Sequence, residues 1–101
     1  RLFENIVFHK LTRENETVYY YKDDKGNEVD FAILTEGKIG ALYQACFDLT
    51  DEETQSREVK SLIKAGATLN CQNLNLVTLE KPDALKLPQE IKIIQAAEFL
   101  Q

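Results

Sequence analysis

Apolar residues recur every three or four positions at the start of the chain, in the run "LFENIVFHKL". This spacing places them on one side of a helix, so it predicts an amphipathic helix over residues 2–13. Two segments rich in β-branched and aromatic residues follow, at 17–22 and 28–34. The turn-forming "DDKGN" of residues 23–27 separates them, and we therefore expect a β-hairpin.

A third strand is predicted over residues 38–49, after a turn at Glu36 and Gly37. Thr50 then has the properties of a helix N-cap, because the acidic residues that follow it favour the first turn of a helix. This helix should run to about Ala65, with a glycine near its C-terminal end.

The last third of the chain predicts two more strands and a short helix. Residues 73–79 indicate a buried strand, residues 81–89 a loop set off by two prolines, and residues 90–94 a strand that leads into a terminal helix. The expected order is α-β-β-β-α-β-β-α, without an internal repeat or a linker. The sequence therefore predicts one α/β domain over residues 1–101.

Composition narrows the class of protein. The chain has 101 residues, of which 44% are hydrophobic, and no apolar run reaches the length of a membrane span. Cys46 and Cys71 lie in apolar surroundings without framework spacing, which favours free thiols in a cytoplasmic protein. The net charge of −5 opposes nonspecific attraction to nucleic-acid phosphates. The absence of Met and the opening Arg1 indicate a piece of a longer protein.

A carboxylate interrupts the apolar pattern of the second strand. Residues two apart in a strand share a face, so Val29, Phe31 and Ile33 should point one way. Asp30 should then point the other way, among apolar neighbours. A buried carboxylate is costly unless it has a partner, and three partners are open here: a lysine side chain, backbone amides or a metal ion.

The third strand repeats this arrangement, because Gln44 and Cys46 should share a face with Leu42. Together with a helix that carries Glu4, and with Asp30, this pattern resembles the signature of the PD-(D/E)XK nuclease superfamily. More narrowly, the chain resembles the domain of unknown function that follows an AAA-type ATPase module in many bacterial and archaeal proteins. The stretches that carry the resemblance are "RLFENIVFHKL", "YYYKDDKGNEVDFAI", "YQACFDLTDEETQSREVKSLIKA" and "LVTLEK".

The resemblance implies a restriction-endonuclease-like core with a mixed sheet and a Mg²⁺ site. Carried over by position, Glu4, Asp30 and Gln44 would hold the ion, and Cys46 takes the place of the lysine that helps to activate water. A thiol carries no positive charge at pH 7, so catalysis should be impaired. A cation from a neighbouring element would compensate, and the residues placed for it are Lys22, Arg57 and Lys60.

Each of these assignments has a structural alternative. Glu4 also suits an acid in a first helical turn, Gln44 a hydrogen-bonded core amide, and Cys46 a small core hydrophobe. A group of cations shares one face of the second long helix, and this face is either simply solvated or contacts nucleic acid: Arg57, Lys60 and Lys64.

Two functions from different classes follow from the sequence. The preferred one is an accessory or recognition module for the attached ATPase, with an impaired nuclease fold. The alternative is an active Mg²⁺-dependent DNA endonuclease. The four glycines form no phosphate-binding GxxxxGK[ST] loop, so nucleotide binding would belong to an N-terminal module outside this chain.

Overall fold

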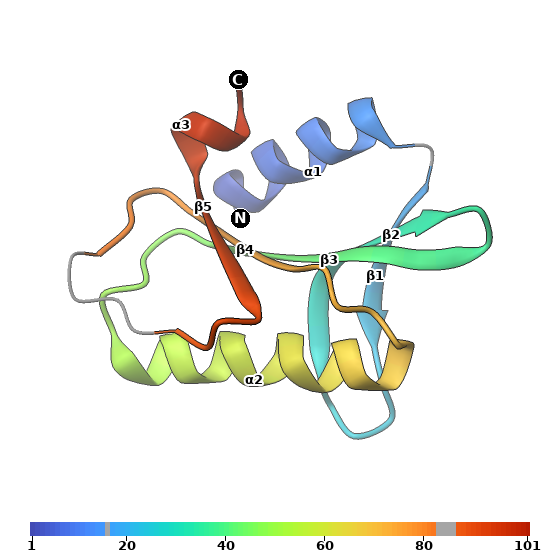
Figure 1. Ribbon diagram of the computed structural model, residues 1–101. Coiled ribbons are helices and arrows are strands. Elements are labelled where there is room, and N and C mark those ends of the chain that lie inside the picture. Colours follow the sequence, from blue (N-terminus) through green and yellow to red (C-terminus); the bar gives the residue numbers. More distant parts are fainter. Residues whose placement is uncertain (16, 83–86) are drawn as a thin grey trace.

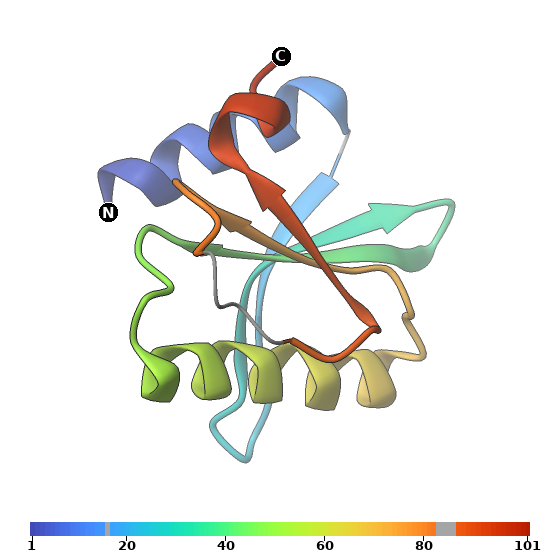
Figure 2. The same cartoon turned by 60° about the vertical axis from the view of Figure 1, so that its left-hand side comes forward.

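The structure has three layers, with a mixed five-stranded sheet between helices on its two faces (Figure 1). It is a computed structural model that describes residues 1–15, 17–82 and 87–101. Helices α1 and α3 lie side by side on one face of the sheet, and α2 runs along the other face (Figure 2). The predicted α/β class, the element order and the mixed sheet are confirmed.

The helices and strands have the following bounds: α1 Leu2–Glu14, β1 Thr17–Lys22, β2 Glu28–Thr35, β3 Lys38–Cys46, α2 Glu52–Leu69, β4 Leu74–Thr78, β5 Ile91–Gln95 and α3 Ala96–Phe99. The middle of the predicted loop at 81–89, residues 83–86, lies outside the described residues. None of the described helices is long and apolar enough to cross a membrane.

The strands follow the order β1-β2-β3-β4-β5 across the sheet, antiparallel as far as β3 and parallel from β3 to β5. Two tight turns build the antiparallel half. Gly26 has a φ of 86° in the first, where the Asp23 carboxylate accepts from the backbone N–H groups of Lys25 and Asn27. In the second, Glu36 and Gly37 have φ values of 51° and 80°, and positive φ at both central residues suits the twist of a hairpin.

The start of α2 differs from the prediction. Asp51 is the N-cap, and its carboxylate accepts from the Thr54 backbone N–H at 3.1 Å. Thr50 instead donates its backbone N–H and its hydroxyl to the Asp48 carboxylate, at 2.9 and 2.7 Å. This local turn also explains why β3 ends at Cys46, three residues before the predicted end.

The end of α2 also lies beyond the prediction, because the glycine is inside the helix rather than after it. A Cβ on Gly66 would lie 2.7 Å from the Cys71 carbonyl oxygen, so this glycine allows the chain that leaves α2 to pass close to the helix. The helix continues to Leu69, and Asn70 takes the left-handed conformation that ends it.

A β-bulge in β2 overturns the predicted alternation of its side chains. Tyr19 of β1 pairs with Ala32 and Tyr21 pairs with Val29, so one residue of β1 opposes two residues of β2. Val29 therefore packs in the cluster under α2, whereas Phe31 packs in the cluster under α1. The prediction that these two side chains share a face is wrong, and the bulge contains Asp30.

Candidate functional site

The strands β2 and β3 run side by side in the sheet (Figure 1). Their backbone pairing reaches as far as Phe31 and Tyr43, and beyond this pair side chains bridge the two strands. The Asp30 backbone N–H donates to Gln44 Oε1 at 2.8 Å, and the Ala45 backbone N–H donates to Asp30 Oδ2 at 2.8 Å. We call this region the fork, and define it as residues 28–30 of β2 and residues 44–46 of β3. Two of the predicted site residues are thus in direct contact there.

Gln44 is almost fully buried, with 4% of its surface exposed. Its amide oxygen accepts from Asp30, and its amide nitrogen lies 3.4 Å from the Glu28 carbonyl oxygen, to which it donates. Both ends of the side chain are therefore engaged with the backbone of β2. This is the hydrogen-bonded core amide that the sequence allowed as an alternative.

Asp30 is half-buried, and a backbone amide is one partner of its carboxylate. Burial raises the pKa of Asp30; the Ala45 N–H opposes this, and the charges of Glu4 and Glu28 add to it. Glu4 is exposed on α1 but lies close enough for its charge to act on Asp30. The structure thus brings the predicted acids of α1 and β2 into one electrostatic environment.

Glu58 belongs to the same environment and was missed in the sequence. Its side chain is 19% exposed, and Arg57 lies 3.9 Å from its Oε1 atom. Burial raises the pKa of Glu58, the charges of Asp30 and Glu4 raise it further, and Arg57 lowers it. The available signal was its position four residues before the buried Leu62, on the inward side of the helix.

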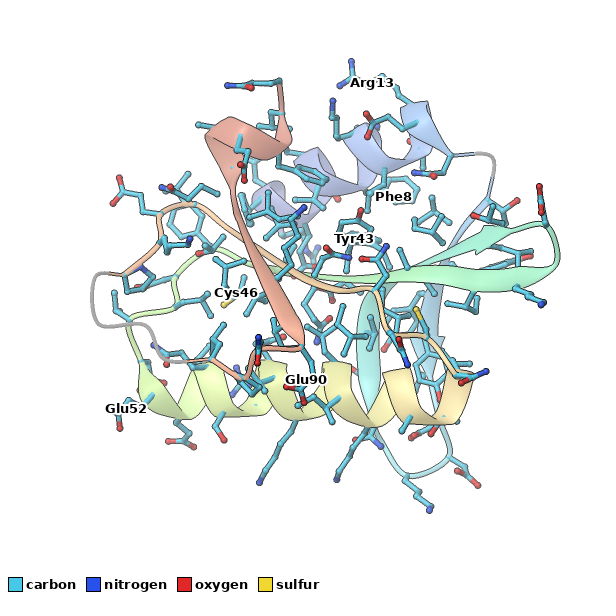
Figure 3. All side chains as sticks on the ribbon, viewed as in Figure 1. Phe8, Arg13, Tyr43, Cys46, Glu52 and Glu90 are labelled. Carbon is cyan, nitrogen blue, oxygen red and sulfur yellow. The ribbon has the colours of Figure 1, made fainter. Side chains whose placement is uncertain are left out.

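Cys46 lies at the end of β3, in the position that the resemblance gives to a lysine (Figure 3). Burial raises the pKa of the thiol to about 11, and the charge of Glu58 contributes to this shift. The S–H group donates to the Asp48 carbonyl oxygen at 3.3 Å. The thiol is therefore protonated and neutral at pH 7. Both cysteines of the chain are buried and free, as predicted.

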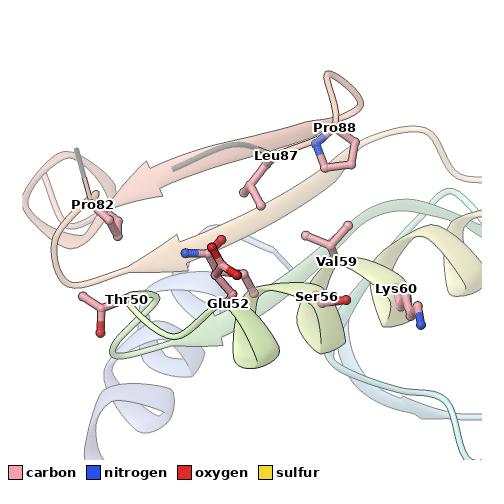
Figure 4. Close-up of a pocket in the computed structure, with 9 residues that line it drawn as sticks. Thr50, Glu52, Ser56, Val59, Lys60, Pro82, Leu87 and Pro88 are labelled. Carbon is pink, nitrogen blue, oxygen red and sulfur yellow. The ribbon is translucent and has the colours of Figure 1, made fainter. Parts of the chain in front are cut away.

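The cations considered as replacements for the lysine lie in different places. Lys22 pairs with the exposed Glu28 at 3.7 Å, and Arg57 acts electrostatically on both Glu58 and Cys46. Lys60 instead lines a cavity of about 660 Å³ beside α2 (Figure 4). The residues that line this cavity are Thr50, Glu52, Gln55, Ser56, Val59, Lys60, Pro82, Leu87 and Pro88, and none of them belongs to the fork.

The predicted nucleic-acid face of α2 is exposed along the helix. Its three members, Arg57, Lys60 and Lys64, all lie on the solvent side. Their spacing of three and four residues places them in one row, and Glu53 lies at the same angle one turn earlier. The face therefore presents a short basic row that begins beside an acid.

The three residues that the resemblance assigns to Mg²⁺ differ in how far their oxygen atoms are already engaged. Carboxylates such as Glu4 and Asp30 are suitable ligands, but the amide oxygen of Gln44 already accepts a hydrogen bond. Within the part of the chain that the structure describes, no group of three or more His, Cys, Asp or Glu side chains is arranged to hold a metal ion. The Mg²⁺ assignment of these three residues stays a prediction.

One family model matches nearly the whole chain. The model of a domain of unknown function, DUF4143, matches residues 1–98. The chain belongs to this family. No curated protein and no solved structure matches it significantly. The match includes all five strands and α2 of the DUF4143 domain, so the fork and the basic row both lie inside the family's own fold.

Proposed function

We propose that this DUF4143 domain is a recognition module with a nuclease-like fold, and that it serves an AAA-type ATPase module of the same polypeptide without cleaving phosphodiester bonds itself. The observation that carries the proposal is the buried, neutral thiol of Cys46. A lysine at that position would supply a positive charge for water activation and for the charge that develops on phosphate. A thiol with a pKa of about 11 supplies neither.

The hydrogen bonds of the fork support the same conclusion. The resemblance assigns Asp30 and Gln44 as two metal ligands, yet both complete the backbone pairing of β2 and β3. These side chains have a structural task that needs no metal ion. A nuclease-like core that has lost its cation and kept this task would remain folded and serve as a binding domain.

The ATPase part of the proposal rests on the resemblance of the sequence to domains that follow such modules. For the ligand, the exposed basic row of α2 is the surface that suits a polyanion, and DNA is the polyanion that the nuclease-like fold favours. Because the net charge of the chain is −5, this contact would be local and strongly weakened by salt.

One observation favours the alternative, a Mg²⁺-dependent DNA endonuclease. Glu4 and Asp30 both raise the pKa of Glu58, and Glu4 raises that of Asp30. A divalent cation near these groups would relieve their mutual repulsion. Arg57 would then be a cation available to the reaction, since it already acts on Glu58 and on Cys46.

A cleavage assay separates the two functions. The chain is incubated with supercoiled plasmid and with single-stranded DNA in Mg²⁺ or Mn²⁺, as wild type, as Asp30→Ala and as Asp24→Ala. Asp24 is an exposed acid in the first hairpin turn and controls for the loss of a surface charge. We expect no cleavage by any of the three. Metal-dependent cleavage that is lost per native molecule in Asp30→Ala and kept in Asp24→Ala would establish the endonuclease instead.

A second assay tests the recognition role directly. The ATP hydrolysis rate of the complete polypeptide is measured with and without this domain, and in the presence and absence of duplex DNA. We expect the rate to change when the domain is removed. An unchanged rate under all four conditions would contradict the ATPase part of the proposal.

A further inference from the structure

The sheet ends on one side at β1, and no other described strand pairs with the outer edge of this strand. Within residues 1–15, 17–82 and 87–101, the backbone of β1 pairs with β2 alone. An edge strand presents unpaired N–H and C=O groups to solvent and is a template for another strand. Tyr19 and Tyr20, in the middle of β1, are 51% and 60% exposed.

The opposite edge of the sheet, β5, differs from β1 in the position of its one charge. Lys92 puts an exposed charge near the middle of a strand of five residues, and α3 begins directly after the strand at Ala96. By contrast, the one charge of β1, "TVYYYK", is its last residue, Lys22, so the middle of this strand is uncharged. Charges and short length are the usual protection against edge pairing, so the two edges differ in their capacity to pair.

We propose that β1 pairs in antiparallel fashion with β1 of a second copy of the chain, so that two sheets join into one. A two-fold axis at Tyr20 places Tyr19 opposite Tyr21 of the second copy, and Val18 opposite Lys22 of the second copy. Aromatic residues that face each other across an antiparallel pair stabilise it. The contact is the same on both copies, as a two-fold dimer requires.

The faces of the side chains agree with this register. Residues directly opposite each other in a sheet point to the same face, so Tyr19 and Tyr21 must share one. They do, because their partners on β2, Ala32 and Val29, both pack in the cluster under α2. The two-fold axis then runs perpendicular to the joined sheet, and the helices of the two copies stay in matching layers.

Charge selects the antiparallel arrangement of the two copies over the parallel one. In a parallel pair in register, Lys22 would lie beside Lys22 of the second copy, and like charges directly opposite each other destabilise a sheet. In the antiparallel pair the two lysines lie at opposite ends. Each Lys22 also keeps its contact with Glu28, which lies on β2, away from the outer edge.

Sedimentation velocity tests the proposal over a range of chain concentrations. The wild type should show a dimer that dissociates on dilution, and Tyr20→Lys should be monomeric, because it puts two positive charges on the two-fold axis. Gln95→Lys is the matched control, since it adds the same charge to the other edge of the sheet, and it should dimerise like the wild type. Circular dichroism of each variant establishes that it is folded.

A cross-link tests the register without disturbing the charge. Paired Cα atoms in an antiparallel sheet lie about 4.5–5.5 Å apart, within the range of a disulfide. Tyr20→Cys should therefore give a covalent dimer under mild oxidation, and Gln95→Cys should not; the native cysteines are buried and should not interfere. A wild type that is monomeric at every concentration, a dimer that survives in Tyr20→Lys, or no cross-link in Tyr20→Cys would overturn the proposal.

Discussion

Two tasks of the Asp30 carboxylate can be separated by substitution: it accepts a hydrogen bond and it carries a charge. Asp30→Ala removes the acceptor of the Ala45 backbone N–H, which donates to it at 2.8 Å in a part-buried place. An unpaired buried donor costs about 1–3 kcal/mol. We therefore expect the free energy of unfolding of Asp30→Ala to be lower than that of the wild type by about this amount at pH 7.

Asp30→Asn is the matched variant, because its amide oxygen still accepts from Ala45 while the charge is lost. Burial and the charges of Glu4 and Glu28 raise the pKa of Asp30, so the fold disfavours the charged form that Asp30→Asn removes. The loss of stability in this variant should be less than about 1 kcal/mol.

The direction of the pH dependence follows from the same raised pKa. The folded chain binds the Asp30 proton more tightly than the unfolded chain, in which the ordinary pKa is 3.8. The group therefore adds stability below pH 3.8, and this contribution is lost as the pH rises through the folded pKa. Asp30→Asn has no such contribution to lose. Its free energy of unfolding relative to the wild type should therefore improve as the pH rises from about 4 to about 7.

Urea unfolding followed by circular dichroism at these two pH values measures the stability of Asp30→Ala, the stability of Asp30→Asn and the dependence of both on pH. The ratio of the denaturant slopes should stay near one, so that the change reflects stability rather than a change in the unfolded state. If Asp30→Ala were as stable as the wild type, the Ala45 hydrogen bond would not stabilise the fork. If Asp30→Asn were as unstable as Asp30→Ala, the charge rather than the hydrogen bond would be the important property.

Three further predictions concern the helix and the thiol. Gly66→Ala should lower the unfolding free energy by about 1–3 kcal/mol in a denaturant titration, because the new Cβ would lie 2.7 Å from a backbone oxygen of the following loop. Gly40→Ala should lower it less, because the nearest atom to its new Cβ would be a side-chain oxygen at 3.3 Å. Asp51→Ala should lose about 0.5–2 kcal/mol as the cap of α2, whereas an equal loss in Thr50→Ala would contradict that assignment. Because the pKa of Cys46 is about 11, its thiol should stay unmodified by a chromogenic disulfide reagent at neutral pH until the chain unfolds. Fast labelling of Cys46 in the folded chain would refute this.

The order of elements was accessible from the sequence because it depends on local patterns. The period of the apolar residues in α1 and the turn residues around Gly26 specify structure within a few positions of themselves. The capping residue of α2 was not accessible in the same way, since Thr50 and Asp51 are both good N-caps. Which of them serves as the cap depends on the Asp48 carboxylate. Thr50 donates its backbone N–H and its hydroxyl to this carboxylate, and Asp51 caps the helix instead.

The candidate site was accessible only in part, because its geometry depends on contacts between elements. Asp30 and Gln44 were found by their polarity in apolar strands, and the structure places them in contact. The bulge places Val29 and Phe31 on opposite faces of the sheet, but the alternation of residue types in the sequence gives no sign of it. Glu58 was missed because an acid in a charged helix usually lies in solvent, and its inward position became visible only with α2 packed on the sheet.

The bridge at the fork has a consequence for how activity is measured in this family. A chain that needs the Asp30 side chain to close its own sheet will lose folded molecules when that residue is replaced, whatever reaction it does or does not perform. Inactivity of an alanine variant at this position is therefore ambiguous unless the rate is divided by the fraction of native molecules. The asparagine variant keeps the bridge while removing the carboxylate, which makes it the more informative substitution for any claim about metal-dependent chemistry.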